Sequence, residues 1–143
     1  MSGDKVFLDT NIIIYAYDLS HKEKHGKALE IIEALWTSGL GVVSTQVLQE
    51  FFYSVTKMIP RPLDVKAVLE IIKDFLKWEV VVNNGDSIIE AIEIYQKYKY
   101  SFWDSLIITS AIRGGANLLI SEDFSHGQII KGIKITNPFM TVK

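Results

Sequence analysis

The chain has 143 residues, enough for one domain with one sizeable core, and we expect residues 1–143 to form that single domain. A hydrophobic content of 48% with 22% charged residues excludes a disordered chain, and no apolar run approaches the ~20 residues that cross a bilayer. The net charge of −2 excludes a protein that grips nucleic acid through a broad basic face, so any contact with nucleic acid must be local.

The first half of the chain alternates apolar runs of strand length with apolar residues at helical spacing. Gly39 ends one predicted helix, and Pro60 and Pro62 prevent another from continuing. In chain order we expect a strand at 5–9, a short helix at 11–17, a helix at 25–38, a strand at 40–44 and a helix at 46–58.

The second half repeats this alternation. Asp64 is an expected N-cap, and the Ser87-x-x-Glu90 and Ser101-x-x-Asp104 spacings predict capping boxes at two further helix starts. We expect a helix at 65–76, a strand at 79–82, a turn at 83–85, helices at 87–99 and 102–113, and strands at 117–121 and 132–136. Strands joined by helical crossovers predict an α/β fold: a mostly parallel central sheet of four to five strands, covered by helices on both faces.

Four acidic residues lie near the predicted strand ends. Asp9 closes the first strand, Asp123 comes two residues after the fourth, and Glu50 lies about one turn into the helix after the second. These three are expected at the carboxyl edge of the sheet, where α/β proteins bind ligands. Asp104 lies in the first turn of the helix before the fourth strand, and we expect it at that edge only if a long connection precedes the helix.

Each acid also has a purely structural interpretation. Asp9 is suited to capping the following helix, and Asp104 to pairing with Ser101 in a capping box. Glu50 fits a solvated helix position, and Asp123 fits a turn. All four acids lie beside aromatic or aliphatic residues, and it is their combination that indicates a shared site.

Clustered carboxylates repel one another, so some of their pKa values should rise unless a cation intervenes. Oxygen ligands suit a hard cation, Mg²⁺ or Mn²⁺, better than zinc. Such a metal site predicts hydrolysis of a phosphodiester bond by a metal-activated water, with Asp9, Glu50, Asp104 and Asp123 as metal ligands and catalytic residues. We expect Thr10, Asn11 and Ser121 to contact the metal ligands rather than the metal itself, and so to orient the carboxylates and the metal-bound waters.

Other ligand patterns are weaker. His21 and His25 have the spacing of a helical metal pair, but no third ligand lies nearby in the sequence, so we expect surface residues. The zero cysteines exclude thiolate sites and disulfides and suit a reducing compartment. The chain has neither a P-loop nor a Gly-x-Ser-x-Gly elbow.

Four runs resemble, in order, the acidic motifs of PIN domains, and residues from His126-Gly127 through Ile135-Thr136-Asn137-Pro138-Phe139 resemble the ending of prokaryotic members. The four runs are Phe7-Leu8-Asp9-Thr10-Asn11-Ile12, Leu48-Gln49-Glu50-Phe51, Phe102-Trp103-Asp104-Ser105-Leu106-Ile107 and Leu119-Ile120-Ser121-Glu122-Asp123-Phe124.

The resemblance implies a three-layer α/β/α sandwich and a Mg²⁺- or Mn²⁺-dependent ribonuclease. It matches Asp9, Glu50, Asp104 and Asp123 to the family's acidic quartet and implies that the helix start at Asp104 lies beside the metal. It also implies a toxin of the VapBC toxin–antitoxin type, with an RNA substrate, a protein antitoxin and a homodimeric state. Whether Glu122 shares the role of Asp123 stays open.

The leading hypothesis is therefore an endoribonuclease toxin. With no basic segment followed by an apolar run at the N-terminus, we expect no signal peptide, no membrane association and a cytoplasmic protein. One alternative is a non-catalytic module of the same fold that binds RNA or protein. A weaker one is a phosphatase with Asp9 as covalent nucleophile, because Asn11 stands where such enzymes usually carry a second aspartate.

Overall fold

Six strands form one central sheet in the computed structural model, which describes residues 3–140, and their order is β3-β2-β1-β4-β6-β5. All neighbouring strands are parallel except β5 and β6. The strands are β1 (Lys5–Leu8), β2 (Gly41–Ser44), β3 (Glu79–Val81), β4 (Ala116–Ile120), β5 (Ile129–Ile130) and β6 (Ile133–Thr136).

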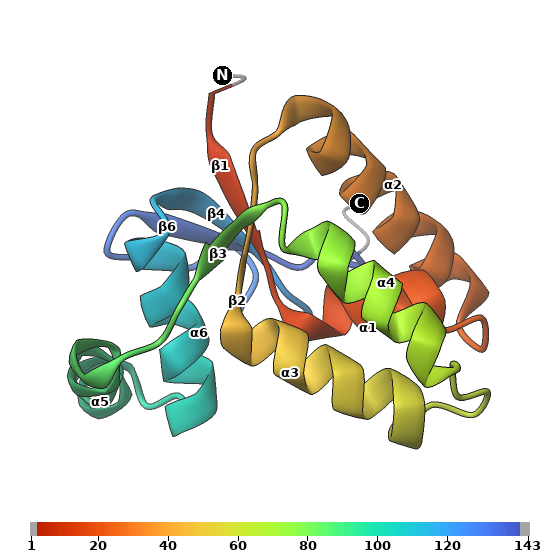
Figure 1. Cartoon of the computed structure of the whole chain (residues 1–143). Helices are drawn as coiled ribbons and strands as arrows, with labels where there is room; N and C mark the ends of the chain where they lie inside the picture. Colours follow the sequence, from red (N-terminus) through yellow and green to blue (C-terminus); the bar gives the residue numbers. More distant parts are fainter. Residues whose placement is uncertain (1–2, 141–143) are drawn as a thin grey trace.

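Helices cover both faces of this sheet (Figure 1). The first four lie on one side and the last two on the other, which makes three layers, and a π-helical turn, η1, continues α3 without a break. The helices are α1 (Thr10–Tyr17), α2 (Lys22–Ser38), α3 (Thr45–Tyr53), η1 (Ser54–Met58), α4 (Val65–Phe75), α5 (Gly85–Tyr98) and α6 (Phe102–Arg113).

The central strands are buried on both faces, and their sequences are therefore continuous apolar runs rather than alternating ones. Phe7 of β1 lies opposite Val42 of β2 on one side and Leu119 of β4 on the other, and all three side chains are fully buried. This register brings the carboxyl ends of β1, β2 and β4 to the same edge of the sheet.

The predicted α/β class and mostly parallel sheet are confirmed, with one strand more than expected. The additional strand is β5, whose two residues pair antiparallel with β6 and are too few to show a recognisable pattern. The capping box of α5 also differs from the prediction: Asn84 and Ser87 form it, so the helix begins at Gly85. Within residues 3–140, no helix is long and apolar enough to cross a membrane.

Candidate active site

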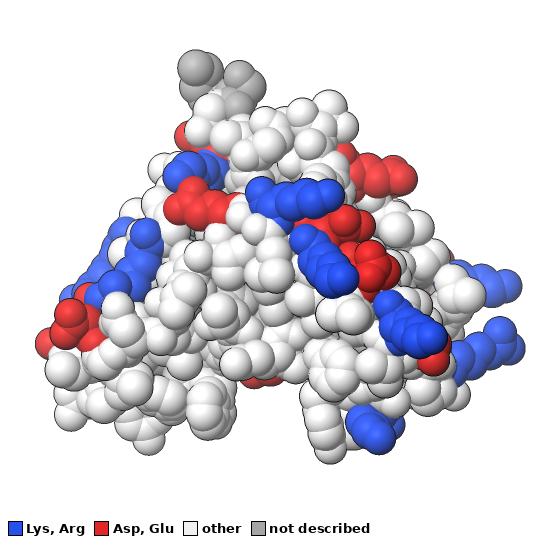
Figure 2. Space-filling view, viewed as in Figure 1, with Lys and Arg blue, Asp and Glu red and all other residues white. Residues whose placement is uncertain are grey.

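The starts of α1, α3 and α6 meet at the carboxyl edge of the sheet (Figure 1). Helices α1 and α3 begin there because they directly follow β1 and β2. Helix α6 begins there because it runs back toward the opposite edge before the chain enters β4, as a crossover between parallel strands requires. All of α5 lies between β3 and α6, so the long connection that we expected before Asp104 is present. Figure 2 shows the molecule indented between α3 and α6, with acidic atoms at the indentation.

Asp9 is the most buried of the four acids, with 4% of its surface exposed. Its side chain is the N-cap of α1, accepting a hydrogen bond from the Thr10 amide at 2.7 Å, and Ser121 Oγ donates to its other oxygen at 2.7 Å. Burial raises the pKa of Asp9 to about 7, although these two hydrogen bonds lower it. The structural and functional interpretations of Asp9 are thus compatible, since capping leaves further lone pairs on each oxygen.

Glu50 is connected to Asp9 through Thr10, the first residue of α1. Thr10 Oγ1 donates to Glu50 Oε1 at 2.6 Å, while its backbone amide donates to Asp9. Glu50 is half-buried and lies near the other acids, and its negative charge adds to the rise in the Asp9 pKa. One threonine therefore orients two of the predicted carboxylates.

Asp104 and Asp123 complete the group. The Asp104 amide donates to Ser101 Oγ, which caps α6, and burial raises the pKa of the half-buried Asp104 carboxyl. The charges of Asp123 and Glu50 raise that pKa further. Asp123 is exposed, and its amide donates at 3.1 Å to Ser121 Oγ, the hydroxyl that also bonds Asp9. The structure thus brings all four predicted acids to one edge, where their charges act on one another.

Glu122, the neighbour of Asp123, has a different environment. Its side chain accepts hydrogen bonds from Lys24 of α2 and from the Tyr15 hydroxyl of α1. Burial alone would raise its pKa, but these two bonds hold the pKa below its ordinary value. Asn11 Oδ1 accepts a bond from the Glu122 amide at 3.3 Å, so Asn11 supports the loop rather than a carboxylate.

Within residues 3–140, no lysine, arginine or histidine forms an ion pair with any of the four acids. The ion pairs of this described part all involve other carboxylates, which leaves the negative charge at this edge unpaired within it. The four acids offer only oxygen atoms to a metal ion, and oxygen is the ligand atom that Mg²⁺ and Mn²⁺ prefer. Among those same residues, no three His, Asp or Glu side chains are already arranged to hold a metal ion. The chemistry of these residues therefore fits a hard divalent cation. Their side chains would have to adjust to coordinate it.

Gln46 is a site residue that the sequence did not reveal. This buried side chain in the first turn of α3 donates through Nε2 to Glu50 Oε2 at 3.2 Å and to the Trp103 carbonyl at 3.3 Å. Trp103 precedes Asp104, so Gln46 links the helix that carries Glu50 to the one that carries Asp104. Its buried Oε1 has no hydrogen-bond partner among the described residues. A glutamine four residues before a glutamate has no distinctive sequence signal.

His21 is exposed and His25 is half-buried. His21 packs edge-on against Tyr15, and His25 Nδ1 lies 3.0 Å from the Tyr15 carbonyl oxygen. A pocket of about 480 Å³ lies beside His25, but none of the four acids lines it. It is separate from the carboxylate edge.

Comparison with known proteins identifies the fold and the family. The PIN domain model matches residues 6–129. Among curated proteins, none matches the chain.

Solved structures share the architecture at low identity. A toxin–antitoxin complex from Klebsiella pneumoniae is 17% identical with a TM-score of 0.69, covering 96% of this chain and 100% of that one. VapC20 from Mycobacterium tuberculosis, a toxin that cleaves the sarcin–ricin loop, is 19% identical with a TM-score of 0.62, covering 80% and 87%. VapBC2 from Rickettsia felis, bound to a fragment of its promoter DNA, is 20% identical with a TM-score of 0.64, covering 92% and 97%.

Proposed function

This chain belongs to the PIN domain family, and we propose that it is a divalent-metal-dependent endoribonuclease, the toxin of a toxin–antitoxin pair. The observation that carries the proposal is the convergence of Asp9, Glu50, Asp104 and Asp123 without a cationic side chain from the described residues. A buried carboxyl beside three others is costly for a fold to maintain, which indicates a functional reason for it.

In this proposal the four acids hold Mg²⁺ or Mn²⁺. The ion, when bound, supplies Lewis acidity and balances the charge of a phosphodiester group. Thr10 and Ser121 keep the Glu50 and Asp9 carboxylates oriented through the hydrogen bonds described above. The exposed Asp123 and half-buried Asp104 form the open side, where an RNA backbone approaches.

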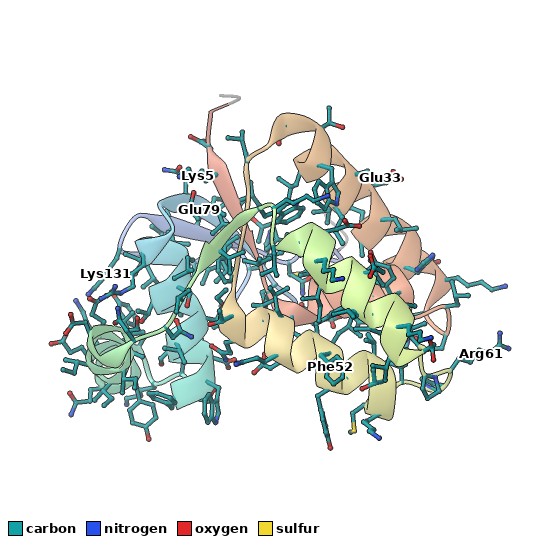
Figure 3. The ribbon with its side chains drawn as sticks, viewed as in Figure 1. Lys5, Glu33, Phe52, Arg61, Glu79 and Lys131 are labelled. Atoms are coloured by element: carbon teal, nitrogen blue, oxygen red, sulfur yellow. The ribbon has the colours of Figure 1, made fainter. Side chains whose placement is uncertain are left out.

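A protein partner is supported by an apolar surface beside the site. Figure 2 shows a broad uncharged area over α3, α5 and α6, and Figure 3 shows Phe52 projecting from α3. Exposed apolar areas of this kind mark protein interfaces. We assign this surface to the antitoxin and to a second copy of the chain in a homodimer, and we place the protein and its RNA substrate in the cytoplasm. Its exposed large residues are Phe52, Tyr53, Ile88, Ile89, Ile92, Tyr95 and Trp103.

The test is RNA cleavage by the Asp9→Asn variant. The amide keeps the size of the side chain but not its charge, so we expect cleavage of a single-stranded RNA in Mn²⁺ to fall by at least about 100-fold. EDTA should stop the wild-type reaction. Circular dichroism checks that the variant is folded.

Glu33→Gln is the matched control, because Glu33 is an exposed acid on α2, far from the carboxylate edge (Figure 3). Its rate should equal that of the wild type. Undiminished cleavage by folded Asp9→Asn, or cleavage in EDTA, would refute the proposed mechanism. Metal-independent RNA binding without cleavage would instead support a non-catalytic module, and a trapped aspartyl phosphate would support the phosphatase alternative.

A further inference from the structure

The loop that carries Asp123 is attached to the helices by its neighbour, Glu122. The two carboxylate oxygens of Glu122 have different partners: Tyr15 Oη donates to Oε1 at 2.6 Å, and Lys24 Nζ pairs with Oε2. Lys24 also lies 3.4 Å from Tyr15 Oη. These contacts join the loop after β4 to both α1 and α2.

Aromatic packing holds Lys24 in place. Its Nζ lies 5.0 Å from the centre of the Tyr15 ring and 5.5 Å from that of Phe139, and these two rings contact each other edge to face. A lysine held over two rings has fewer alternative rotamers to lose when it pairs with a carboxylate. We call the three residues Tyr15, Lys24 and Glu122 the loop clamp.

The loop has no regular secondary structure between Ser121 and Gln128. Backbone hydrogen bonds from the Ser121 and Gly127 amides hold its two ends against β6, and side-chain contacts hold the residues next to Ser121. The Glu122 amide donates to Asn11, and the Asp123 amide donates to Ser121 Oγ. Residues 122–124 form a bend, so neighbouring side chains there face different parts of the fold. With Glu122 held against α1 and α2, Asp123 is left on the side where its charge reaches Asp9 and Asp104.

We propose that the loop clamp of Tyr15, Lys24 and Glu122 is a positioning device that holds Asp123 in place for the divalent cation. This inference rests on the proposed function and assigns these three residues no contact with RNA or metal. A partly exposed ion pair contributes little to stability, so the main effect of the clamp is on the geometry of Asp123. Glu122 therefore does not share the ligand role of Asp123.

The test compares Glu122→Ala and Lys24→Met with the wild type. Methionine keeps the aliphatic stem over the rings but removes the ion pair. We expect Mn²⁺ affinity, measured by calorimetry on the RNA-free protein, to fall about tenfold. We expect kcat to fall by a similar factor with KM for RNA unchanged, and amide hydrogen exchange to accelerate at residues 122–125. Lys24→Arg, which keeps the charge, should recover most of the affinity.

Glu79→Ala is the matched control. It removes the Lys5–Glu79 pair, a 2.7 Å ion pair that joins β1 and β3 at the edge opposite the acids (Figure 3). This variant should keep Mn²⁺ affinity and kcat at wild-type values. Unchanged Mn²⁺ affinity in Glu122→Ala and Lys24→Met, or an equal loss in Glu79→Ala, would overturn the positioning role. A wild-type protein that neither binds Mn²⁺ nor cleaves RNA would refute the proposed function itself, which separates the two failures.

Discussion

Asp9 combines two roles, because the side chain that caps α1 is also the most buried acid of the cluster. The Thr10 amide and the Ser121 hydroxyl stabilise its charged form, and burial with neighbouring charge opposes it. The second effect is larger, since the pKa rises to about 7. Without a cation, Asp9 is therefore a group whose protonation stabilises the folded state.

The stability of the metal-free protein should consequently depend on pH in a definite direction. An acid whose pKa is higher in the folded state than in the unfolded state takes up a proton on folding. Between its ordinary pKa of 3.8 and the folded value of about 7, the Asp9 contribution to the free energy of unfolding falls as pH rises. The pKa of Asp104 is also raised, so its contribution to the free energy of unfolding falls with rising pH as well.

Urea unfolding in EDTA at several pH values measures this effect. The free energy of unfolding of the wild type should decline between pH 5 and pH 8, and Asp9→Asn should show a smaller decline. The difference should be of the order of a few kcal/mol at most. Glu33→Gln should keep the full decline. An Asp9→Asn curve parallel to that of the wild type would mean that Asp9 is ionised at little cost in the folded protein.

At the scale of elements, the position of Asp104 depends on how closely α6 packs against β2 and β3. Gly114 ends α6 with a backbone φ of −78°, which any residue adopts, so its lack of a side chain serves packing. A Cβ there would lie 2.7 Å from Val42 Cγ1 and 3.0 Å from Val81 Cγ2. Val42 is fully buried and has no space to move into.

Gly114→Ala should therefore displace the end of α6 and destabilise the fold. We expect a loss of about 1–3 kcal/mol, typical of overpacking, and a lower thermal midpoint. Gly26→Ala is the control, because Gly26 lies inside α2 and a Cβ added there would have no neighbouring atom within 4 Å. That change should be neutral or stabilising by up to about 1 kcal/mol, since alanine favours helices. Equal midpoints for the two variants would contradict the packing argument.

At the scale of the whole molecule, the proposed RNA substrate would meet a protein with a net charge of −2. Figure 2 shows lysine and arginine side chains spread over the upper part and the two sides of the viewed face, with few beside the indentation between α3 and α6. A protein that contacts few phosphates releases few counterions on binding. Under the proposed function, the metal site and short-range contacts, rather than a basic face, would hold the substrate.

Salt dependence tests this directly. Each phosphate contact to single-stranded RNA contributes a slope of about −0.7 to a plot of log affinity against log salt. We expect kcat/KM for a short RNA at fixed Mn²⁺ to fall with a slope no steeper than about −2 between 50 and 200 mM NaCl, equivalent to about three contacts. A slope near −5 would reveal a basic surface that the charge distribution does not predict.

The sequence alone was sufficient for the α/β class and the alternation of elements, whereas the metal-binding role of the four acids stays a prediction. Buried parallel strands require continuous apolar runs, and strand ends leave acids such as Asp9 in recognisable positions. The two-residue strand β5 and the Asn84 cap escaped prediction, because a short segment has no period and several polar residues fit a cap equally well.

Only the tertiary structure decided how the acids are held. Gln46 contacts Trp103, and Lys24 contacts Glu122, across separations of 57 and 98 residues. Helical or strand periodicity describes which face of one element a residue occupies, but not what a second element places opposite it. The distinction between Glu122 and Asp123, one residue apart, therefore depended on the contacts that the Glu122 side chain makes with α1 and α2.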